Sequence, residues 1–319
     1  MRMLRFRAST TRALLAATTI VLPFWLSMTS AAWARAEFAL RPGHLYGNGD
    51  LGLFEFDAAL NPVAFLPLPH TRWTQGVAFT PDAHLVTSAF EINADSTQTH
   101  HVLELDSAGH VVHDVDLHIS SLDRAADIDV DAAGRIYAAS TPNLIEVQPD
   151  FGGFRTMPWS FNRASGVAVG SDDFLYATDQ GTRQVIVFDT ARNHQRNIGT
   201  GGLPTGIDFG PAGQLYVCDY TASQLRRLDL ASNTFSTVLT NHDFISDVEF
   251  AADGSYYVSW YNGHRIEHRS PQDALLQFYE SGDTSDALAV YVPEPGAAAV
   301  GLLLAVLGTV IRARHRRRS

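Results

Sequence analysis

Lysine is absent from this 319-residue sequence, and all 23 of its basic residues are arginines. Five of them lie in residues 1–36 and five in residues 312–318, so 13 remain in the stretch between, which holds all 34 acidic residues. That stretch therefore has a formal charge near −21. Such an acidic body is repelled by phosphates, which argues against nucleic-acid binding and is compatible with an exported domain that meets cations or neutral sugars.

Cysteine is nearly absent as well, because Cys218 is the only one, and no intramolecular disulfide can form. It lies in the apolar run 215–218, where a buried and unreactive thiol is expected. The sequence also lacks Gly-x-Ser-x-Gly, His-Glu-x-x-His, the P-loop and the Rossmann glycine pattern. These absences argue against the corresponding enzyme classes, although a site built from dispersed residues would leave no such signature.

The N-terminus has the three parts of a secretory signal peptide. Four arginines between Arg2 and Arg12 precede the apolar segment 13–28, and no acid occurs before Glu37. Small residues then predict cleavage after Ala34 or Ala36, so residues 1–36 are expected to be removed. An uncleaved membrane anchor is the alternative.

The C-terminus also has three parts: Pro293-Glu294-Pro295, an uncharged apolar run at 297–311 and an arginine cluster at 312–318. A helix over the run would span about 22 Å, short of a hydrocarbon core of about 30 Å unless it begins near Pro293. The arginine cluster is expected to stay in the cytoplasm, with the body of the protein outside.

The order and spacing of these parts resemble the PEP-CTERM sorting signal of exported bacterial proteins, here residues 293–319. This resemblance implies an exosortase that cuts near Pro-Glu-Pro. It also implies an inner-membrane helix before processing, then the periplasm, outer surface or extracellular matrix of a Gram-negative cell, often with exopolysaccharide. The alternative is a plain C-terminal membrane anchor.

Between the two ends the sequence repeats. Tyr137, Tyr176, Tyr216 and Tyr257 are spaced by 39, 40 and 41 residues, and each repeat has four short apolar runs separated by Gly-containing turns. This pattern predicts one four-stranded blade per repeat. The repeats resemble NHL-type propeller blades, most clearly at 166–189.

Five repeats begin near Gly76, Asp127, Gly166, Gly206 and Asp247, and a sixth begins at 287–290 but then meets the C-terminal tail. Its other strands are predicted at 44–46, 51–56 and 63–65. We therefore expect residues 37–292 to form an all-β, six-bladed β-propeller, with the ring closed by a C-terminal strand that joins three N-terminal strands. The second repeat is longer, and its extra residues predict a loop that contains Glu91, Asn93 and Asp95.

Acidic residues at the starts of the repeats are candidate ligands for Ca²⁺ or another divalent cation at the mouth of the channel: Asp127, Asp247 and Asp286. The alternative is that these carboxylates bind backbone amides at turns. A second set is predicted on the face with the longer loops, where its aromatic and polar side chains would bind a ligand such as a sugar: Trp159, Asp179, Asp219, Trp260 and Asn262. Blade packing is the alternative for the tryptophans.

These features favour a non-enzymatic binding or interaction module whose expected partners, besides the exosortase, are a polysaccharide or an envelope protein. The alternative is a metal-dependent lactonase-like hydrolase or lyase, because six-bladed relatives include gluconolactonase-like enzymes. The matching positions here are mostly neither acidic nor amide, which argues against the alternative: Gln75, Ser165, Thr205 and Ser246.

Overall fold

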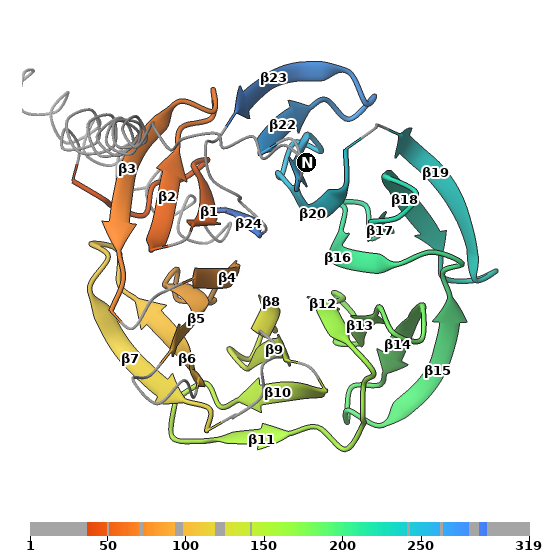
Figure 1. The fold of residues 1–319 in the computed structure, drawn as a ribbon, viewed down its shortest axis with the longest axis horizontal. Coiled ribbons are helices and arrows are strands. Elements are labelled where there is room, and N and C mark those ends of the chain that lie inside the picture. The colour runs from red at the N-terminus through yellow and green to blue at the C-terminus, as the bar shows by residue number, and fades with distance from the viewer. Residues whose placement is uncertain are drawn as a thin grey trace, which may run out of the picture. The chain divides into compact units, whose positions relative to one another are not determined.

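The structure, a computed structural model, describes residues 37–49, 51–69, 73–92, 98–118, 125–140, 142–240, 243–261, 264–280 and 287–291. The chain divides into two compact units, Met1–Glu37 and Phe38–Ser319, and the fold belongs to the second. In its described part, 24 strands form six antiparallel sheets of four strands. Figure 1 shows these sheets as blades around a central axis, which confirms the predicted six-bladed propeller.

Blade 1 combines the C-terminal strand with three N-terminal strands, and each other blade is a run of four consecutive strands. Named from the inner to the outer strand, blade 1 contains β24 (Leu288–Val290), β1 (Leu45–Gly49), β2 (Gly52–Phe56) and β3 (Pro62–Pro67), and blade 2 contains β4 (Trp73–Phe79), β5 (Leu85–Ile92), β6 (Gln98–Leu105) and β7 (Val111–Asp116). Blade 3 contains β8 (Ala125–Val130), β9 (Ile136–Ser140), β10 (Asn143–Val147) and β11 (Phe154–Thr156), and blade 4 contains β12 (Ala164–Val169), β13 (Leu175–Asp179), β14 (Gln184–Phe188) and β15 (His194–Gly199). Blade 5 contains β16 (Pro204–Phe209), β17 (Leu215–Asp219), β18 (Gln224–Asp229) and β19 (Thr234–Thr240), and blade 6 contains β20 (Ile245–Phe250), β21 (Tyr256–Trp260), β22 (Arg265–Arg269) and β23 (Leu275–Glu280).

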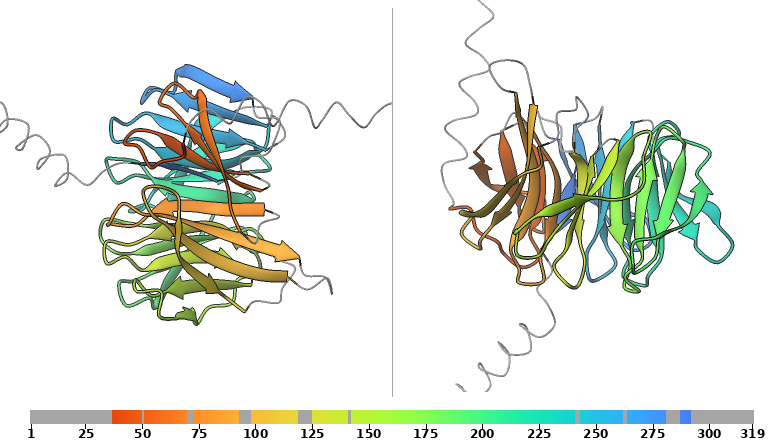
Figure 2. Two further views of the ribbon diagram at one scale, coloured as in Figure 1. Left: turned by 90° about the vertical axis from the view of Figure 1, so that its left-hand side faces the viewer. Right: turned by 90° about the horizontal axis from the view of Figure 1, so that it is seen from below.

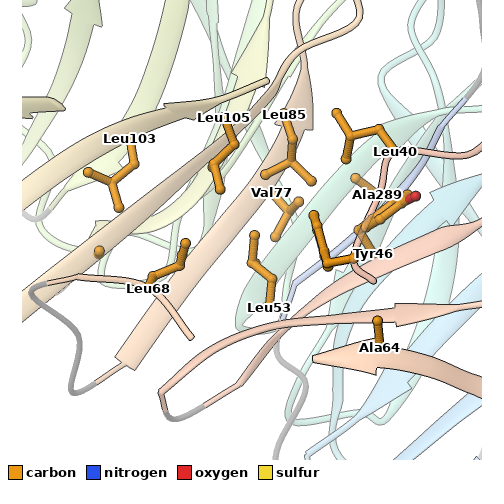
Figure 3. Close-up of a cluster of buried hydrophobic side chains, with 12 residues drawn as sticks. Leu40, Tyr46, Leu53, Ala64, Leu68, Val77, Leu85, Leu103, Leu105 and Ala289 are labelled. Atoms are coloured by element: carbon orange, nitrogen blue, oxygen red, sulfur yellow. The ribbon is translucent and has the colours of Figure 1, made fainter. Parts of the chain in front are cut away.

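The hydrophobic core lies between the blades. Second strands such as β9, β13 and β21 are buried along their whole length, because both of their faces pack against neighbouring blades. Outer strands such as β7 and β15 are largely exposed. Figure 3 shows the layer between blades 1 and 2, where Leu53 of β2 faces Val77 and Leu85 of β4 and β5.

Ring closure fixes where the chain enters and leaves the propeller. β24 pairs antiparallel with β1, with Val290 opposite Leu45, which confirms the predicted closure. Tyr291 donates a backbone hydrogen bond to the His44 carbonyl (3.0 Å), and Gly43 donates one to the Tyr291 carbonyl (2.9 Å). Both described ends therefore lie on the side of the ring that bears the turns between first and second strands.

We call this side the turn face. The opposite side, the loop face, bears the connections between second and third strands and the connections between blades. Figure 2 shows the strands running across the ring from one face to the other. The two faces thus differ in what they can offer a partner: the turn face has the chain ends, and the loop face has the more variable connections.

Blade 2 accommodates its extra residues differently from the predicted loop. Strand β5 runs to Ile92 and strand β6 begins at Gln98, so both strands are eight residues long. Glu91 pairs with Thr99 in the β-ladder and is therefore part of a strand. The strand-favouring residues on either side of it, Phe90 and Ile92, account for the continuation. Residues 93–97 lie outside the described part.

The predicted signal peptide (residues 1–36) and sorting signal (residues 293–319) also lie outside the described residues. Within the part that the structure describes, we find no helix with the length and apolar character needed to cross a membrane.

Candidate functional site

The inner strands of all six blades line a narrow channel on the axis of the propeller, around a cavity of about 160 Å³. Five of the lining side chains are acidic and none is basic: Asp127, Asp129, Asp208, Asp247 and Glu249. They occupy two equivalent positions, which read Asp-x-Asp in blade 3, Gly-x-Asp in blade 5 and Asp-x-Glu in blade 6. The same positions in the other blades hold only glycine or alanine.

A bulge shifts the register of the inner strand next to these positions in blades 2 to 6. Glycine at the first position lets neighbouring inner strands approach closely. A Cβ atom on Gly206 would lie 2.3 Å from Oδ1 of Asp247, so any larger residue would displace this carboxylate. The bulges and glycines thus place the acidic side chains of one blade against the backbone of another.

Burial raises the pKa of four of these acids. It raises the pKa of Asp129 to about 6 and that of Asp127, Asp208 and Glu249 well above the usual range. Facing carboxylates raise the pKa further, notably Asp247 acting on Asp127 from the opposite side of the ring. These four acids therefore keep their protons to a higher pH than exposed carboxyl groups do.

Hydrogen bonds show what these carboxylates hold together. Asp127 accepts the N–H of Ile128 (2.9 Å) and, across the junction to blade 4, the N–H of Val167 (3.0 Å). Asp129 repeats the arrangement with Val130 at 2.7 Å and Val169 at 2.6 Å. Each carboxylate thus joins its own inner strand to that of the next blade.

The same geometry recurs at two more junctions. Asp208 of blade 5 accepts the N–H of Phe250 in blade 6 at 3.2 Å. Asp247 and Glu249 of blade 6 accept the N–H groups of Leu288 (2.9 Å) and Val290 (3.0 Å) in β24 of blade 1. The last two bonds hold the closing strand, so the channel acids contribute directly to the integrity of the ring.

The predicted cation site is not assembled in the described residues. Asp127 and Asp247 both line the channel, but on opposite blades, and Asp286 lies outside the described part. Across the described ranges, no group of three His, Cys, Asp or Glu side chains has the geometry to hold a metal ion. Asp127 accepts the N–H of Val167 and Asp247 accepts the N–H of Leu288, so the donor set does not fit a resident metal in this arrangement.

The predicted loop-face acids are also engaged by the backbone. Asp179 accepts the N–H groups of Asn162 (3.0 Å), Arg163 (2.9 Å) and Gly181 (3.0 Å). It therefore joins the connection between blades 3 and 4 to the loop that follows β13. Asp219 accepts the N–H of Ala222 at 3.1 Å, and it is buried. Both carboxylates therefore stabilise loops, and Asn262 lies outside the described residues.

The two predicted tryptophans do not form a common surface. Trp260 is only 1% exposed and packs in the core with Cys218 and Leu225 of blade 5, because it is the last residue of a strand that is buried on both faces. Trp159 stacks on His194, the first residue of an outer strand, with ring centroids 4.0 Å apart. The predicted sugar platform is corrected accordingly: Trp260 is a core residue, and Trp159 lies at the rim between blades 3 and 4.

A different set of aromatic residues gathers on the loop face. Tyr220 and Phe244 stack with centroids 4.4 Å apart and an interplanar angle of 11°, and Tyr261 meets Tyr220 edge-on at 6.2 Å. We call these three residues the aromatic cluster. Sequence reasoning missed it, although Tyr220 and Tyr261 share one signal: each is the first residue after a second strand.

Cys218 is buried, as the sequence predicted. Burial and the nearby channel carboxylates, Asp247 first among them, raise the pKa of its thiol well above the usual range. The thiol therefore stays protonated and unreactive in the folded protein.

The fold and the channel define the class of this protein, a six-bladed β-propeller with an acidic axial channel. Neither a family model nor a curated protein matches the sequence. Solved structures do match. A chain of a nidogen/laminin complex is 13% identical with a TM-score of 0.66, and the match covers 77% of this chain and 97% of that one.

Two solved proteins named as enzymes share the fold. Virginiamycin B lyase from Staphylococcus aureus is 13% identical, with a TM-score of 0.54 and a match over 77% of this chain and 87% of that one. A protein to which gluconolactonase activity is ascribed is 17% identical, with a TM-score of 0.56 and coverages of 70% and 82%. At these identities the likeness establishes the propeller architecture alone.

Proposed function

We propose that this protein is an exported binding module, which holds a partner on its loop face and catalyses no reaction. The observation that carries the proposal is the separation of the two faces. The described chain ends, Phe38 and Tyr291, lie on the turn face, whereas the aromatic cluster lies on the loop face. An attachment through either end therefore leaves the loop face free to meet a partner.

The sequence supports export and sorting. Residues 1–36 are typical of a signal peptide, and the segment that begins at Pro293-Glu294-Pro295 resembles a PEP-CTERM signal. In this proposal the C-terminal helix anchors the protein in the inner membrane until an exosortase processes it. The processed protein then acts in the periplasm, on the outer surface or in the extracellular matrix. The likeness to a chain from a nidogen/laminin complex supports a binding role for the fold.

The second candidate is a metal-dependent lactonase-like hydrolase or lyase with its site in the channel. Five carboxyl groups around one cavity and the likeness to a lyase and a gluconolactonase favour it. The hydrogen bonds weigh against it, because each channel carboxylate already accepts a backbone N–H of the next blade. A reacting group that also holds the ring together would disturb the fold whenever it changed its charge.

A fractionation experiment tests export and sorting. The full chain, carrying an epitope tag in the exposed turn near Asp172, is produced in a Gram-negative host that has an exosortase. We expect the protein outside the cytoplasm and shortened at its C-terminus. Replacement of Pro293, Glu294 and Pro295 by alanine should leave it full-length in the inner membrane. A full-length wild-type protein in the cytoplasm would contradict the proposal.

An activity assay separates the two candidates. The exported protein is incubated with lactone substrates in the presence of Ca²⁺, Mg²⁺, Mn²⁺ or Zn²⁺, and Asp247→Asn serves as the matched variant. We expect no turnover with any metal. Hydrolysis by the wild type that is lost in Asp247→Asn would overturn the binding proposal and establish a channel active site.

A further inference from the structure

We propose that the aromatic cluster is a binding subsite for a neutral carbohydrate, with Tyr261 as the residue most exposed to the ligand. This inference rests on the proposed function, because it names the ligand class and the place of contact on the loop face. Its starting point is the convergence of three rings from three separate connections of blades 5 and 6.

The cluster is held in position before any ligand arrives. Tyr220 follows β17, Phe244 precedes β20 and Tyr261 follows β21. The N–H of Tyr220 binds the Leu203 carbonyl at 2.9 Å, and the N–H of Tyr261 binds the Phe244 carbonyl at 2.7 Å. The backbone bonds hold the connections, and the ring contacts hold the side chains, so a ligand would meet the cluster without ordering a loop.

The exposure of the rings suits a ligand that lies against an aromatic surface. Tyr261 is 42% exposed, and Tyr220 and Phe244 are half-buried beside it. Tyr220 and Phe244 each use one ring face to stack on the other. Tyr261 has only an edge-to-face contact with Tyr220, so more of its ring is left for a ligand. A pyranose ring has an apolar C–H face of matching size, and its hydroxyl groups stay in water at the rim.

The surroundings favour a sugar over a protein partner. A stable protein interface takes roughly 800 Å² from each side, with an apolar centre. Among the described residues of blades 5 and 6 at the loop face, Tyr261 is the one large apolar side chain classed as exposed. Polar residues adjoin the cluster: Thr221 follows Tyr220 in the chain, and the backbone N–H of His264 faces the Tyr261 carbonyl at 3.5 Å. Polar groups beside an aromatic ring suit a hydroxyl-rich ligand.

Charge narrows the choice of ligand further. The stretch between the two arginine-rich ends has 13 arginines and 34 acidic residues, so an anionic polysaccharide would be repelled. A neutral polysaccharide would meet no such repulsion.

Affinity electrophoresis of the exported protein tests this inference. The gels contain a neutral polysaccharide (dextran, mannan or xyloglucan) or the anionic polysaccharide alginate. We expect at least one neutral polysaccharide to retard the wild type and Tyr261→Ala to bind about tenfold more weakly. The matched control is Phe278→Ala, which removes a 48% exposed ring from the outer strand of the same blade and should bind as the wild type does. Equal melting temperatures would show that all three proteins are folded.

The outcomes separate this inference from the proposed function. Equal binding by Tyr261→Ala and the wild type, or binding to alginate alone, would overturn the carbohydrate subsite. If no polysaccharide is bound but Tyr261→Ala is no longer retained at the cell surface, the ligand is a protein. That result would overturn the subsite and leave the binding module intact. If the wild type is neither retained nor retarded, both proposals fail.

Discussion

Two kinds of hydrogen bond join a blade to the inner strand of the next blade. Carboxylates join blade 3 to 4, 5 to 6 and 6 to 1. Neutral groups join other blades: Asn48 donates to the Thr74 carbonyl between blades 1 and 2, and Thr178 donates to the Thr205 carbonyl between blades 4 and 5, both at 2.7 Å. The blades have the same architecture in either case, so acids are not required to build such a junction.

The difference between the junctions lies in their response to pH. A neutral amide or hydroxyl donates its hydrogen bond at any physiological pH. A buried carboxyl group with a raised pKa stabilises the fold while it is protonated. The free energy of unfolding falls once the group ionises. The acidic junctions should therefore weaken toward neutral pH and the neutral junctions should not.

The largest expected effect concerns the apolar part of an acidic junction. Trp260→Ala removes a fully buried ring between blades 5 and 6 and should lower the free energy of unfolding by about 3–5 kcal/mol. Denaturant titration measures this change. The adjacent Tyr261→Ala is the control, and because Tyr261 is 42% exposed this substitution should cost less than about 1 kcal/mol. Equal losses in the two variants would contradict the placement of these rings.

The second prediction concerns a carboxylate itself. The pKa of Asp129 is about 6 in the folded protein, and an unfolded aspartate has a pKa of about 3.9. Its contribution to stability is fully present below pH 4 and is lost as pH rises to about 6. The loss amounts to about 3 kcal/mol at most. In Asp129→Asn, the free energy of unfolding should no longer show this loss between pH 4 and pH 6. Denaturant titration at pH 4 to 7 measures it.

A matched control for this measurement is Asp189→Asn. Asp189 is a partly exposed turn residue, and the backbone N–H of Asn193 lowers its pKa. Asp189 therefore titrates at a lower pH than Asp129. In Asp189→Asn the free energy of unfolding should still decline between pH 4 and pH 6, as in the wild type. The same slope in Asp129→Asn as in the wild type would show that Asp129 does not titrate as the structure implies.

The smallest effect is expected at a neutral junction. Thr178→Val removes the donor to the Thr205 carbonyl and the acceptor of the Gly166 N–H (2.6 Å). The free energy of unfolding should fall by about 1–2 kcal/mol. The loss should be the same at pH 4 and pH 7. A loss that changes with pH would mean that the two kinds of junction are coupled.

The architecture could be predicted from the sequence because its signals are local. The spacing of Tyr137, Tyr176, Tyr216 and Tyr257 gave the blade period, and these residues occupy equivalent places on the second strands. Closure followed from an incomplete repeat at one end and unassigned strands at the other. The length of β5 was misjudged, because a charged residue such as Glu91 resembles a loop signal even when its neighbours extend the strand.

The candidate site was harder to predict from the sequence, because it depends on the direction in which each strand points its side chains. Strand alternation applied to Asp127 and Asp247 would have added Asp129 and Glu249, two residues further along. Trp260 is in the core because β21 is buried on both faces. The aromatic cluster joins Tyr220, Phe244 and Tyr261 across two blades, so its members come from connections that are separate in the sequence.

We propose that the channel acids join blades and hold no metal ion. The most direct test is thermal unfolding of the exported protein in EDTA and then with Ca²⁺, Mg²⁺, Mn²⁺ or Zn²⁺. A metal present at 100 times its Kd would add about 2.7 kcal/mol to the stability, which a melting curve resolves. We predict the same melting temperature in every case. A rise with one metal that disappears in Asp127→Asn or Asp247→Asn would contradict the account.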